Sequence, residues 1–219
     1  MKGRIAAAAA AAARNVEDVT LLAVSKTFGA DAVRIAHAVG ECHFGENYVL
    51  EGIEKIVALA DLRSRLEWHL IGPLQSNKTR VVAEQFDWVH SVDRLKIAQR
   101  LSAQRPEGLP PLQVCLQVNV SGEPSKSGVP AGEVAALADA VAALPRLRLR
   151  GLMAIPEPAA DYAAQCVPHR ALTQLLQQLR TGGLPQLDTL SMGMSADLEA
   201  AIAEGATIVR IGTAIFGSR

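Results

Sequence analysis

The run Thr20-Leu21-Leu22-Ala23-Val24-Ser25 is aliphatic along most of its length, as expected of a strand that is buried on both faces. Lys26 follows it, and Phe28-Gly29-Ala30-Asp31 then turns into a segment with helical spacing. A strand followed by a turn and a helix is the repeating unit of α/β proteins. The sequence therefore predicts that Lys26 lies at the carboxyl end of a central strand.

Similar aliphatic runs, each bounded by turn residues, recur along the whole chain. With residues 20–25 they make eight, the others being 41–44, 66–71, 86–90, 112–120, 147–154, 186–191 and 207–211. Segments with helical spacing lie between them. Strands that alternate with helices favour parallel pairing and right-handed crossovers, and eight such units predict a single closed (β/α)8 TIM-type barrel. An open, doubly wound sheet is the alternative.

The two ends of the chain complete this picture. Residues 1–18 are expected to form an extra N-terminal helix that packs on the barrel, because Ala6–Ala13 consists of the strongest helix former. The last strand is followed by too few residues for a full helix, so the N-terminal helix is expected to cover that flank. A signal peptide is the less favoured interpretation, because no leucine-rich segment follows the charged start. No composition change marks a linker, so residues 1–219 are predicted to form one domain.

Charge and cysteine content restrict the function. The 22 basic and 22 acidic residues give a formal net charge of zero, which argues against nucleic acid or an anionic membrane as the main partner. No apolar run is long enough to span a membrane. Cys42, Cys115 and Cys166 lie far apart and have no zinc-ligand spacing. These features predict reduced thiols in a cytoplasmic protein and no metal site.

Polar and glycine-bearing clusters follow one strand after another at the carboxyl end, where the loops of a barrel form the functional site. A desolvated lysine there loses its charge and becomes a nucleophile that attacks carbonyl groups. Lys26 is the candidate, with a snorkelling lysine as the alternative interpretation and with Lys78 and Lys126 as rivals. The loops 191–195 and 212–213 follow strands seven and eight, the usual phosphate position in barrels.

The histidines point less clearly to chemistry. His69 and His90 each follow a tryptophan near a strand end, and packing or hydrogen bonding is the expected role of both. His169 is expected to face solvent. The sequence has no nucleophile elbow, P-loop or paired-carboxylate motif.

In combination, these motifs resemble the pyridoxal phosphate homeostasis protein family over residues 20–219. The resemblance is carried by Ala23-Val24-Ser25-Lys26-Thr27, Phe44-Gly45-Glu46-Asn47-Tyr48, Trp68-His69-Leu70-Ile71-Gly72, Leu74-Gln75-Ser76-Asn77-Lys78, Gln117-Val118-Asn119, Ser125-Lys126-Ser127-Gly128, Gly151-Leu152-Met153, Leu190–Ser195 with Asp197-Leu198-Glu199, and Val209-Arg210-Ile211-Gly212-Thr213. This family is similar to the barrel half of bacterial alanine racemase, a fold-type III pyridoxal phosphate (PLP) barrel, without the second β-domain.

The resemblance implies a role for each site residue. Lys26 would hold PLP as an internal aldimine, Arg210 would face the pyridine nitrogen, and Asn47 and Met153 would line the ring. Phosphate binding would fall to Ser191, Gly193, Gly212 and Thr213. The protein would be a non-catalytic monomer that carries or buffers PLP in intracellular PLP homeostasis, with apo forms of PLP-dependent enzymes as recipients.

The alternative function is that of a small PLP-dependent amino-acid racemase. Racemisation needs acid/base groups on opposite faces of the substrate carbon. Lys26 could serve one face, whereas the resemblance places the second base of alanine racemase, a tyrosine, in the domain without a counterpart here. Tyr48 and Tyr162 are the tyrosines of this chain, and Tyr48 is expected to pack at the start of a helix.

Overall fold

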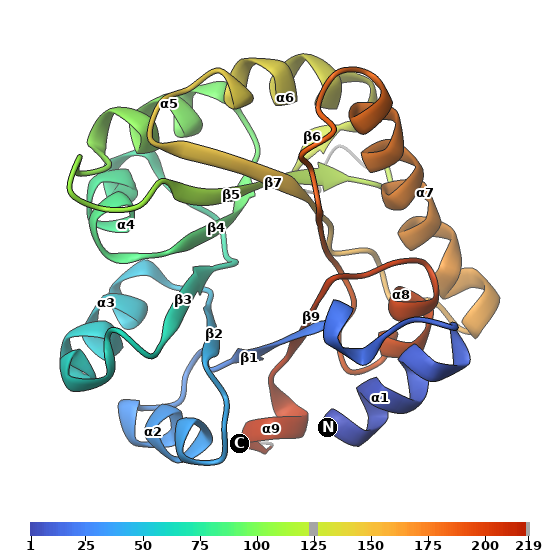
Figure 1. Ribbon diagram of the computed structural model, residues 1–219, viewed down its shortest axis with the longest axis horizontal. Helices are drawn as coiled ribbons and strands as arrows, with labels where there is room; N and C mark the ends of the chain where they lie inside the picture. The colour runs from blue at the N-terminus through green and yellow to red at the C-terminus, as the bar shows by residue number, and fades with distance from the viewer. Residues whose placement is uncertain (123–126, 218–219) are drawn as a thin grey trace.

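The computed structural model describes residues 1–122 and 127–217 of the chain. Eight parallel strands form a ring in the order β4-β3-β2-β1-β9-β8-β7-β5, and pairing of β4 with β5 closes it (Figure 1). The strands of the ring are β1 (Thr20–Val24), β2 (His43–Glu46), β3 (Glu67–Leu70), β4 (Trp88–Val92), β5 (Leu112–Asn119), β7 (Leu147–Met153), β8 (Thr189–Ser191) and β9 (Ile208–Ile211). The predicted (β/α)8 barrel is confirmed, and the β4–β5 pairing rules out an open sheet.

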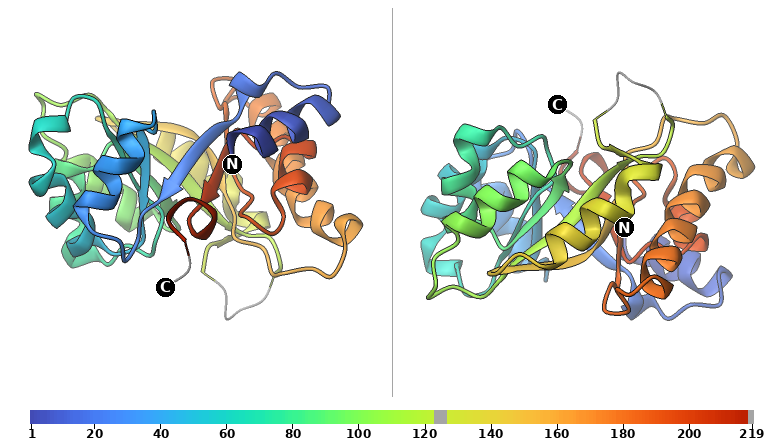
Figure 2. Two further views of the ribbon diagram at one scale, coloured as in Figure 1. Left: turned by 90° about the horizontal axis from the view of Figure 1, so that it is seen from below. Right: turned by 90° about the horizontal axis from the view of Figure 1, so that it is seen from above.

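Helices wrap the outside of the ring, as Figure 2 shows from two sides. They are α1 (Lys2–Ala11), α2 (Ala30–Ala38), α3 (Val49–Ala58), α4 (Thr79–Gln85), α5 (Leu95–Gln104), α6 (Val134–Ala142), α7 (Tyr162–Thr181), α8 (Leu198–Ala203) and α9 (Thr213–Phe216). A two-residue strand, β6 (Val129–Pro130), pairs with the end of β5. Among the described residues, none of the helices has both the length and the apolar character needed to cross a bilayer.

The second strand begins later than the sequence predicted. Residues 41–42 instead connect β2 to the turn that ends α2, where Gly40 has a φ of +95°. The Glu41 N–H donates to the Ala36 carbonyl at 3.1 Å and the Gly40 N–H to the His37 carbonyl at 2.9 Å. These two bonds form a Schellman motif, which satisfies the last carbonyls of the helix and delays the strand.

The N-terminal helix α1 is shorter than the predicted residues 1–18 and lies beside α8 (Figure 1). It ends in a second Schellman motif, which places Ala13 at a φ of +54°. Arg4 forms an ion pair with Glu199 of α8 at 2.6 Å, and Ile5 is 2% exposed. The final helix, α9, has four residues, so α1 supplies much of the cover on this side of the barrel.

The interior of the barrel differs from the layer between strands and helices. Its apolar part is a small cluster of Leu22, Val24, Ile71, Trp88, Cys115, Met153 and Ile208. Four of the buried polar side chains on the barrel strands are joined by hydrogen bonds: His69, His90, Ser191 and Arg210. Apolar side chains therefore fill only part of the barrel, and a line of polar groups approaches the carboxyl ends of the strands.

Candidate functional site

A cavity of about 800 Å³ opens at the carboxyl ends of β1 and β9. Its polar lining includes Lys26, Asn47, Arg210 and Thr213, while Val24, Phe28, Ile71, Ile155 and Met194 contribute apolar walls. Among the described residues that line it, two carry a positive charge and none is acidic. The cavity therefore suits an anionic ligand that has an apolar ring.

Lys26 lies two residues beyond the end of β1 and is exposed to solvent. The sequence had predicted a lysine desolvated by an apolar floor, and for the protein alone this is wrong. The strand ends at Val24, and Lys26 belongs to the loop that follows it rather than to the apolar cluster inside the barrel. Its side chain lines the cavity and is accessible from solvent.

The loop that carries Lys26 is held from below by a buried lysine, Lys55 of α3. Its ammonium donates to the Ser25 carbonyl at 2.6 Å, to Glu46 at 2.7 Å and to Glu51 at 2.8 Å. Burial raises the pKa of the Glu46 carboxyl, although hydrogen bonds from Lys55 and the Ser25 hydroxyl act in the opposite direction. The network fixes the residue before Lys26 by charge-assisted bonds.

On the other side of Lys26, Thr27 adopts a φ of +68°, a left-handed conformation that a branched residue rarely occupies. Its N–H donates to the Glu51 carboxylate, and its hydroxyl donates to the Lys26 carbonyl at 2.5 Å. Strained backbone of this kind persists only where neighbouring contacts hold it. Lys26 thus lies between Ser25 and Thr27, and both of these residues are hydrogen-bonded to side chains of α3.

Sequence reasoning missed these contacts. The visible signal was the i,i+4 spacing of Glu51 and Lys55, which normally marks a solvated pair on a helix surface. Lys55 is only 4% exposed, however, and it reaches Glu46 of β2. Burial converts a common surface pair into a support for the site.

Arg210, on β9, lines the cavity and is 4% exposed. One Nη donates to the Ser191 carbonyl at 2.6 Å and to the Ser191 hydroxyl at 2.9 Å, and the other donates to the Ala154 carbonyl at 2.8 Å. Burial lowers the pKa of the guanidinium to about 10, so it remains charged at neutral pH. Among the described residues no carboxylate forms an ion pair with it, and its charge is left to act on a ligand.

Asn47 offers a second binding group. Its side-chain Oδ1 is buried and has no hydrogen-bond partner among the described residues. The loop comes close to Gly72, where an added Cβ would lie 2.1 Å from the Asn47 carbonyl oxygen. A buried acceptor without a partner costs about 1–3 kcal/mol, so this amide is suited to bind a ligand donor.

The two loops predicted to bind phosphate meet at the wall of the cavity. Ser195 and Ala196 come from the loop after β8, and Gly212 and Thr213 come from the loop after β9. The Met194 N–H is not available for a ligand, because it donates to Asp197 at 2.7 Å.

Three predicted site residues do not line the cavity. The Ser191 hydroxyl is fully buried between His90 and Arg210, so its role as a phosphate ligand is not supported. Gly193 has a φ of +90° and packs on Ala201, where an added Cβ would lie 2.4 Å from the alanine Cβ. Met153 is fully buried in the apolar cluster inside the barrel. All three support the wall from behind.

The remaining candidates lie elsewhere. Lys78 and Tyr48 do not line the cavity, and Tyr162 is 55% exposed at the start of α7. Lys126 lies outside the described residues. His169, expected to face solvent, is 1% exposed because its Nε2 binds Asp197 at 2.9 Å, which in turn caps the loop at Met194.

A second cavity of about 490 Å³ adjoins the first and shares Asn47, Ile71, Ile155 and Met194 with it. Glu157 is the acidic residue among the described residues that line it. The shared wall gives the site a second chamber beyond Asn47.

The closed barrel, with a lysine after its first strand and an arginine on its last, defines the class of alanine racemase-type barrels. The family model for the alanine racemase N-terminal domain matches residues 2–219. Alanine racemase from Corynebacterium glutamicum has the same fold, with a TM-score of 0.68 at 18% identity over 98% of this chain and 59% of that one.

Relatives with higher sequence identity indicate a particular family. A pyridoxal phosphate homeostasis protein from Pseudomonas aeruginosa is 66% identical over 99% of this chain and 91% of its own length. The Escherichia coli K12 protein of the same name is 56% identical over 100% and 94%. PipY of Synechococcus elongatus, solved with PLP bound, has a TM-score of 0.85 at 40% identity over 97% of this chain and 100% of that one. The chain belongs to the pyridoxal phosphate homeostasis protein family.

Proposed function

We propose that this protein binds PLP covalently through Lys26 and carries or buffers it in the cell without turnover. The observation that carries the proposal is the cavity itself, which brings an accessible lysine, a buried arginine and an unpartnered amide oxygen together. The solved complex of PipY with PLP supports it. PLP supplies an aldehyde that an amine attacks and a ring that withdraws electrons.

The residues present fit PLP in charge and in shape. Lys26 and Arg210 provide positive charge for a phosphorylated ligand, and no acidic residue among the described ones lines the cavity to oppose it. Val24, Ile71 and Ile155 provide apolar surface for a ring. Ser195, Gly212 and Thr213 would bind the phosphate, Arg210 would face the pyridine nitrogen, and Asn47 would accept from a donor on the ring.

The absence of turnover is part of the proposal. Apart from Lys26 and Arg210, none of the described residues that line the main cavity has a titratable side chain, so a second acid/base group for racemisation is missing there. Glu157 in the adjoining chamber is the nearest candidate for such a group. A permanently charged arginine opposite the pyridine nitrogen would also keep that nitrogen unprotonated and weaken electron withdrawal.

We further infer a monomer of one domain in the cytoplasm, with apo PLP-dependent enzymes as recipients and with neither nucleic acid nor membrane as a partner. The reducing compartment is supported by Cys42, Cys115 and Cys166, which are all unpaired. Thiol titration of the unreduced, denatured protein should find three thiols, and a count of one would contradict this location.

Borohydride reduction followed by peptide mapping tests the covalent link. PLP should label Lys26, and Lys26→Ala should lose the visible chromophore. The unfolding curves of the PLP-free wild type and variant should be the same, because Lys26 is exposed. Lys78→Ala is the matched control and should keep the chromophore. Label found only on another lysine would overturn the assignment.

Two further measurements test the phosphate site and the missing turnover. Spectral titration should show PLP binding orders of magnitude more tightly than pyridoxal, since several charge-assisted hydrogen bonds are lost without the phosphate. Single amino-acid enantiomers in deuterated water should show no sustained inversion. Inversion beyond stoichiometry that disappears in Lys26→Ala would establish the racemase alternative, and its loss in Glu157→Gln would identify the second base.

A further inference from the structure

A continuous chain of hydrogen bonds crosses the interior of the barrel from its amino-terminal end to the cavity. Glu67 Oε1 lies 3.0 Å from His69 Nε2, and His69 Nδ1 lies 2.9 Å from His90 Nε2. His90 Nδ1 lies 2.8 Å from the Ser191 hydroxyl, which lies 2.9 Å from an Nη of Arg210. The links come from β3, β4, β8 and β9, and each inner side chain is almost fully buried.

The chemistry of the two ends fixes the direction of the chain. An ionised carboxylate only accepts hydrogen bonds and a guanidinium only donates them. His69 must therefore carry its proton on Nε2 and accept at Nδ1, which requires His90 to donate from Nε2. His90 then accepts at Nδ1, so the Ser191 hydroxyl donates to it and accepts from Arg210. One arrangement of protons with both imidazoles neutral satisfies every link.

The surroundings keep both imidazoles neutral. Burial lowers the pKa of His69, and Glu67 opposes this shift while His43 adds to it. Burial lowers the pKa of His90 well below its ordinary value, with His69 and Arg210 adding to the shift and Glu67 opposing it. Trp88 stacks on His69 with ring centroids 5.3 Å apart, which excludes water from this part of the chain.

Glu67 also accepts from His43 Nδ1 at 3.1 Å, so His43, Glu67 and His69 bring three metal-ligand atoms within 4.8 Å of one another. A metal ion is not needed to explain this cluster. Each ring nitrogen that faces Glu67 already has the carboxylate as its acceptor. The cluster is instead the accepting end of the chain, where Glu67 stays 40% exposed in the cavity at the amino-terminal end.

At the other end, the chain orients Arg210. The hydrogen bonds within the described residues engage only its two Nη nitrogens, so Nε and one N–H of the second Nη remain as donors of a residue that lines the cavity. If His90 donated from Nδ1, the Ser191 hydroxyl would accept from both His90 and Arg210, and its own buried proton would have no acceptor in the chain and would compete with the guanidinium. The direction imposed at Glu67 prevents this.

We propose that Glu67, His69, His90 and Ser191 are positioning residues that hold Arg210 in one orientation by a one-way hydrogen-bonded chain. Its consequence for PLP rests on the proposed function, whereas the chain is a property of the protein alone. Glu67, at the amino-terminal end of the barrel, thereby controls the orientation of Arg210 at the carboxyl end.

Long-range ¹H–¹⁵N NMR of the PLP-free protein tests the direction of the chain, because it distinguishes the two neutral imidazole tautomers. His69 and His90 should both carry the proton on Nε2 at pH 7.5, whereas His43, which donates from Nδ1, should be the other tautomer. Signals are assigned with His→Gln variants. An Nδ1–H tautomer or an imidazolium at His69 or His90 would overturn the proposal, whether or not PLP binds.

Two substitutions of Glu67 then distinguish the effect of hydrogen-bond direction from the effect of a changed side-chain shape. Glu67→Gln keeps an oxygen acceptor and should leave both tautomers unchanged. Glu67→Lys places a donor there and should move the proton of both His69 and His90 to Nδ1. Asp188→Lys, at the same end of the barrel but outside the chain, is the control for added positive charge. Unchanged tautomers in a folded Glu67→Lys protein would contradict the proposal.

The effect on the cavity is measured by PLP titration and by the visible spectrum. Glu67→Lys should weaken PLP binding about two- to tenfold and shift its absorption, the effect of one misdirected hydrogen bond. Ser191→Ala should do the same while it leaves both tautomers in place, which provides a second variant if Glu67→Lys does not fold. Equal PLP affinity and spectra in wild type, Glu67→Lys and Ser191→Ala would refute the link to Arg210. If wild type fails to bind PLP, only the proposed function fails.

Discussion

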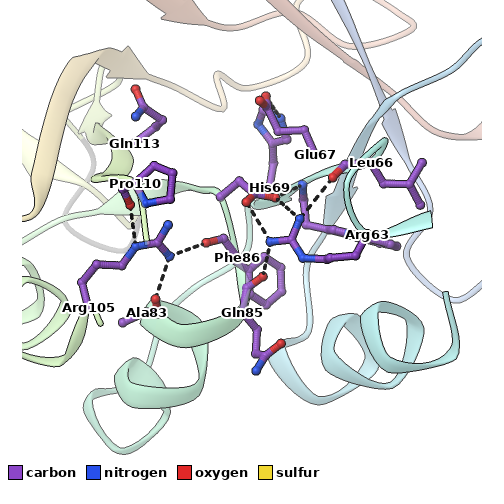
Figure 3. A network of polar contacts seen from close by, with 12 residues as sticks. Arg63, Leu66, Glu67, His69, Ala83, Gln85, Phe86, Arg105, Pro110 and Gln113 are labelled. Carbon is purple, nitrogen blue, oxygen red and sulfur yellow. Dashed lines mark hydrogen bonds and ion pairs between the residues drawn. The ribbon is translucent and has the colours of Figure 1, made fainter. Parts of the chain in front are cut away.

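The two ends of the barrel use arginine and lysine in opposite ways. At the amino-terminal end, a cavity of about 600 Å³ is lined by five arginines, and the inner ones are bound. Arg63 pairs with Asp87 at 2.8 Å. Arg105 donates to the Ala83, Phe86 and Pro110 carbonyls (Figure 3). At the carboxyl end, Lys26 is exposed. Arg210 is held by carbonyls as Arg105 is, but it lines the candidate ligand cavity, and no carboxylate among the described residues pairs with it.

This difference separates stability from binding. Charges that are paired in the structure are already compensated, and their removal leaves a partner unsatisfied. The exposed charge of Lys26 contributes little to folding and retains its capacity for a ligand. The comparison assigns a structural role to the amino-terminal end and a binding role to the carboxyl end, in keeping with other barrels. Lys55 is the exception, since it is a paired charge next to the binding site.

Lys55→Met should have the largest effect on stability. It leaves the buried Glu46 carboxyl and the partly buried Glu51 without their cation, and the free energy of unfolding should fall by about 3–5 kcal/mol. Urea unfolding measures this loss, and PLP titration should show weaker binding, because the Lys26 loop loses its hydrogen bond to Lys55. Lys2→Met, which removes a cation that is 62% exposed, should cost less than about 1 kcal/mol and leave PLP binding unchanged. Equal losses of stability in Lys55→Met and Lys2→Met would contradict the distinction between paired, buried charges and exposed charges.

The hydrogen-bonded chain from Glu67 to Arg210 predicts that the free energy of unfolding depends on pH. The pKa values of His69 and His90 are lowered in the folded protein, so the unfolded chain binds more protons once the pH falls below about 6.5. Their stabilisation is present above that pH and is lost as the pH falls, by up to about 1.4 kcal/mol per histidine and pH unit.

Urea unfolding at pH 7.5 and 5.5 measures this dependence. The raised pKa of Glu46 acts in the opposite direction, since its contribution is lost as the pH rises, and Glu46→Gln removes that contribution. In the Glu46→Gln background, the protein should be less stable at pH 5.5. His90→Gln should reduce the difference and His37→Gln should not. A stability independent of pH would show that the imidazoles of the chain take up protons without cost.

Asp87→Ala should affect the amino-terminal end alone. Asp87 accepts two bonds from Arg63 and one from the Trp68 N–H at 2.9 Å, and the free energy of unfolding should fall by about 2 kcal/mol, since Arg63 is partly exposed. PLP affinity should remain within twofold of wild type. Asp188→Ala, which breaks a more exposed pair with Arg150, should cost about 1 kcal/mol or less. A tenfold loss of PLP affinity in Asp87→Ala would remove the separation of the two ends.

The sequence predicted the barrel because hydrophobic runs and helical spacing are local signals. All eight predicted runs contain strands, and the errors, such as residues 41–42, are set by cap hydrogen bonds that the spacing does not show. Lys26, Arg210 and Thr213 were placed at one end because parallel strands share a direction. Ring closure depends on the β4–β5 pairing, which no local signal contains.

The site was predicted only as far as strand position determines it. Side chains that point into the barrel lie at different depths, and the depth decides whether a side chain meets a ligand or is buried beneath the cavity. Ser191 and Met153 were expected at the ligand, but both are fully buried in the barrel interior. The direction of the chain from Glu67 to Arg210 depends on distances among four strands, so no spacing in the sequence indicates it.

Ala13→Gly, a substitution away from the cavities at both ends of the barrel, should have the smallest effect and serves as a reference for the others. Ala13 is exposed and occupies the left-handed position of the Schellman motif after α1, where an L-residue pays roughly 1–2 kcal/mol. Glycine relieves this strain but costs about 0.5–1 kcal/mol in chain entropy, so the net gain should be about 0.5–1 kcal/mol. Ala12→Gly, at a φ of −88°, relieves nothing and should cost about 0.5 kcal/mol. Urea unfolding measures both variants, and PLP affinity should not change in either. A loss of stability in Ala13→Gly would mean that α1 does not end in this motif in solution.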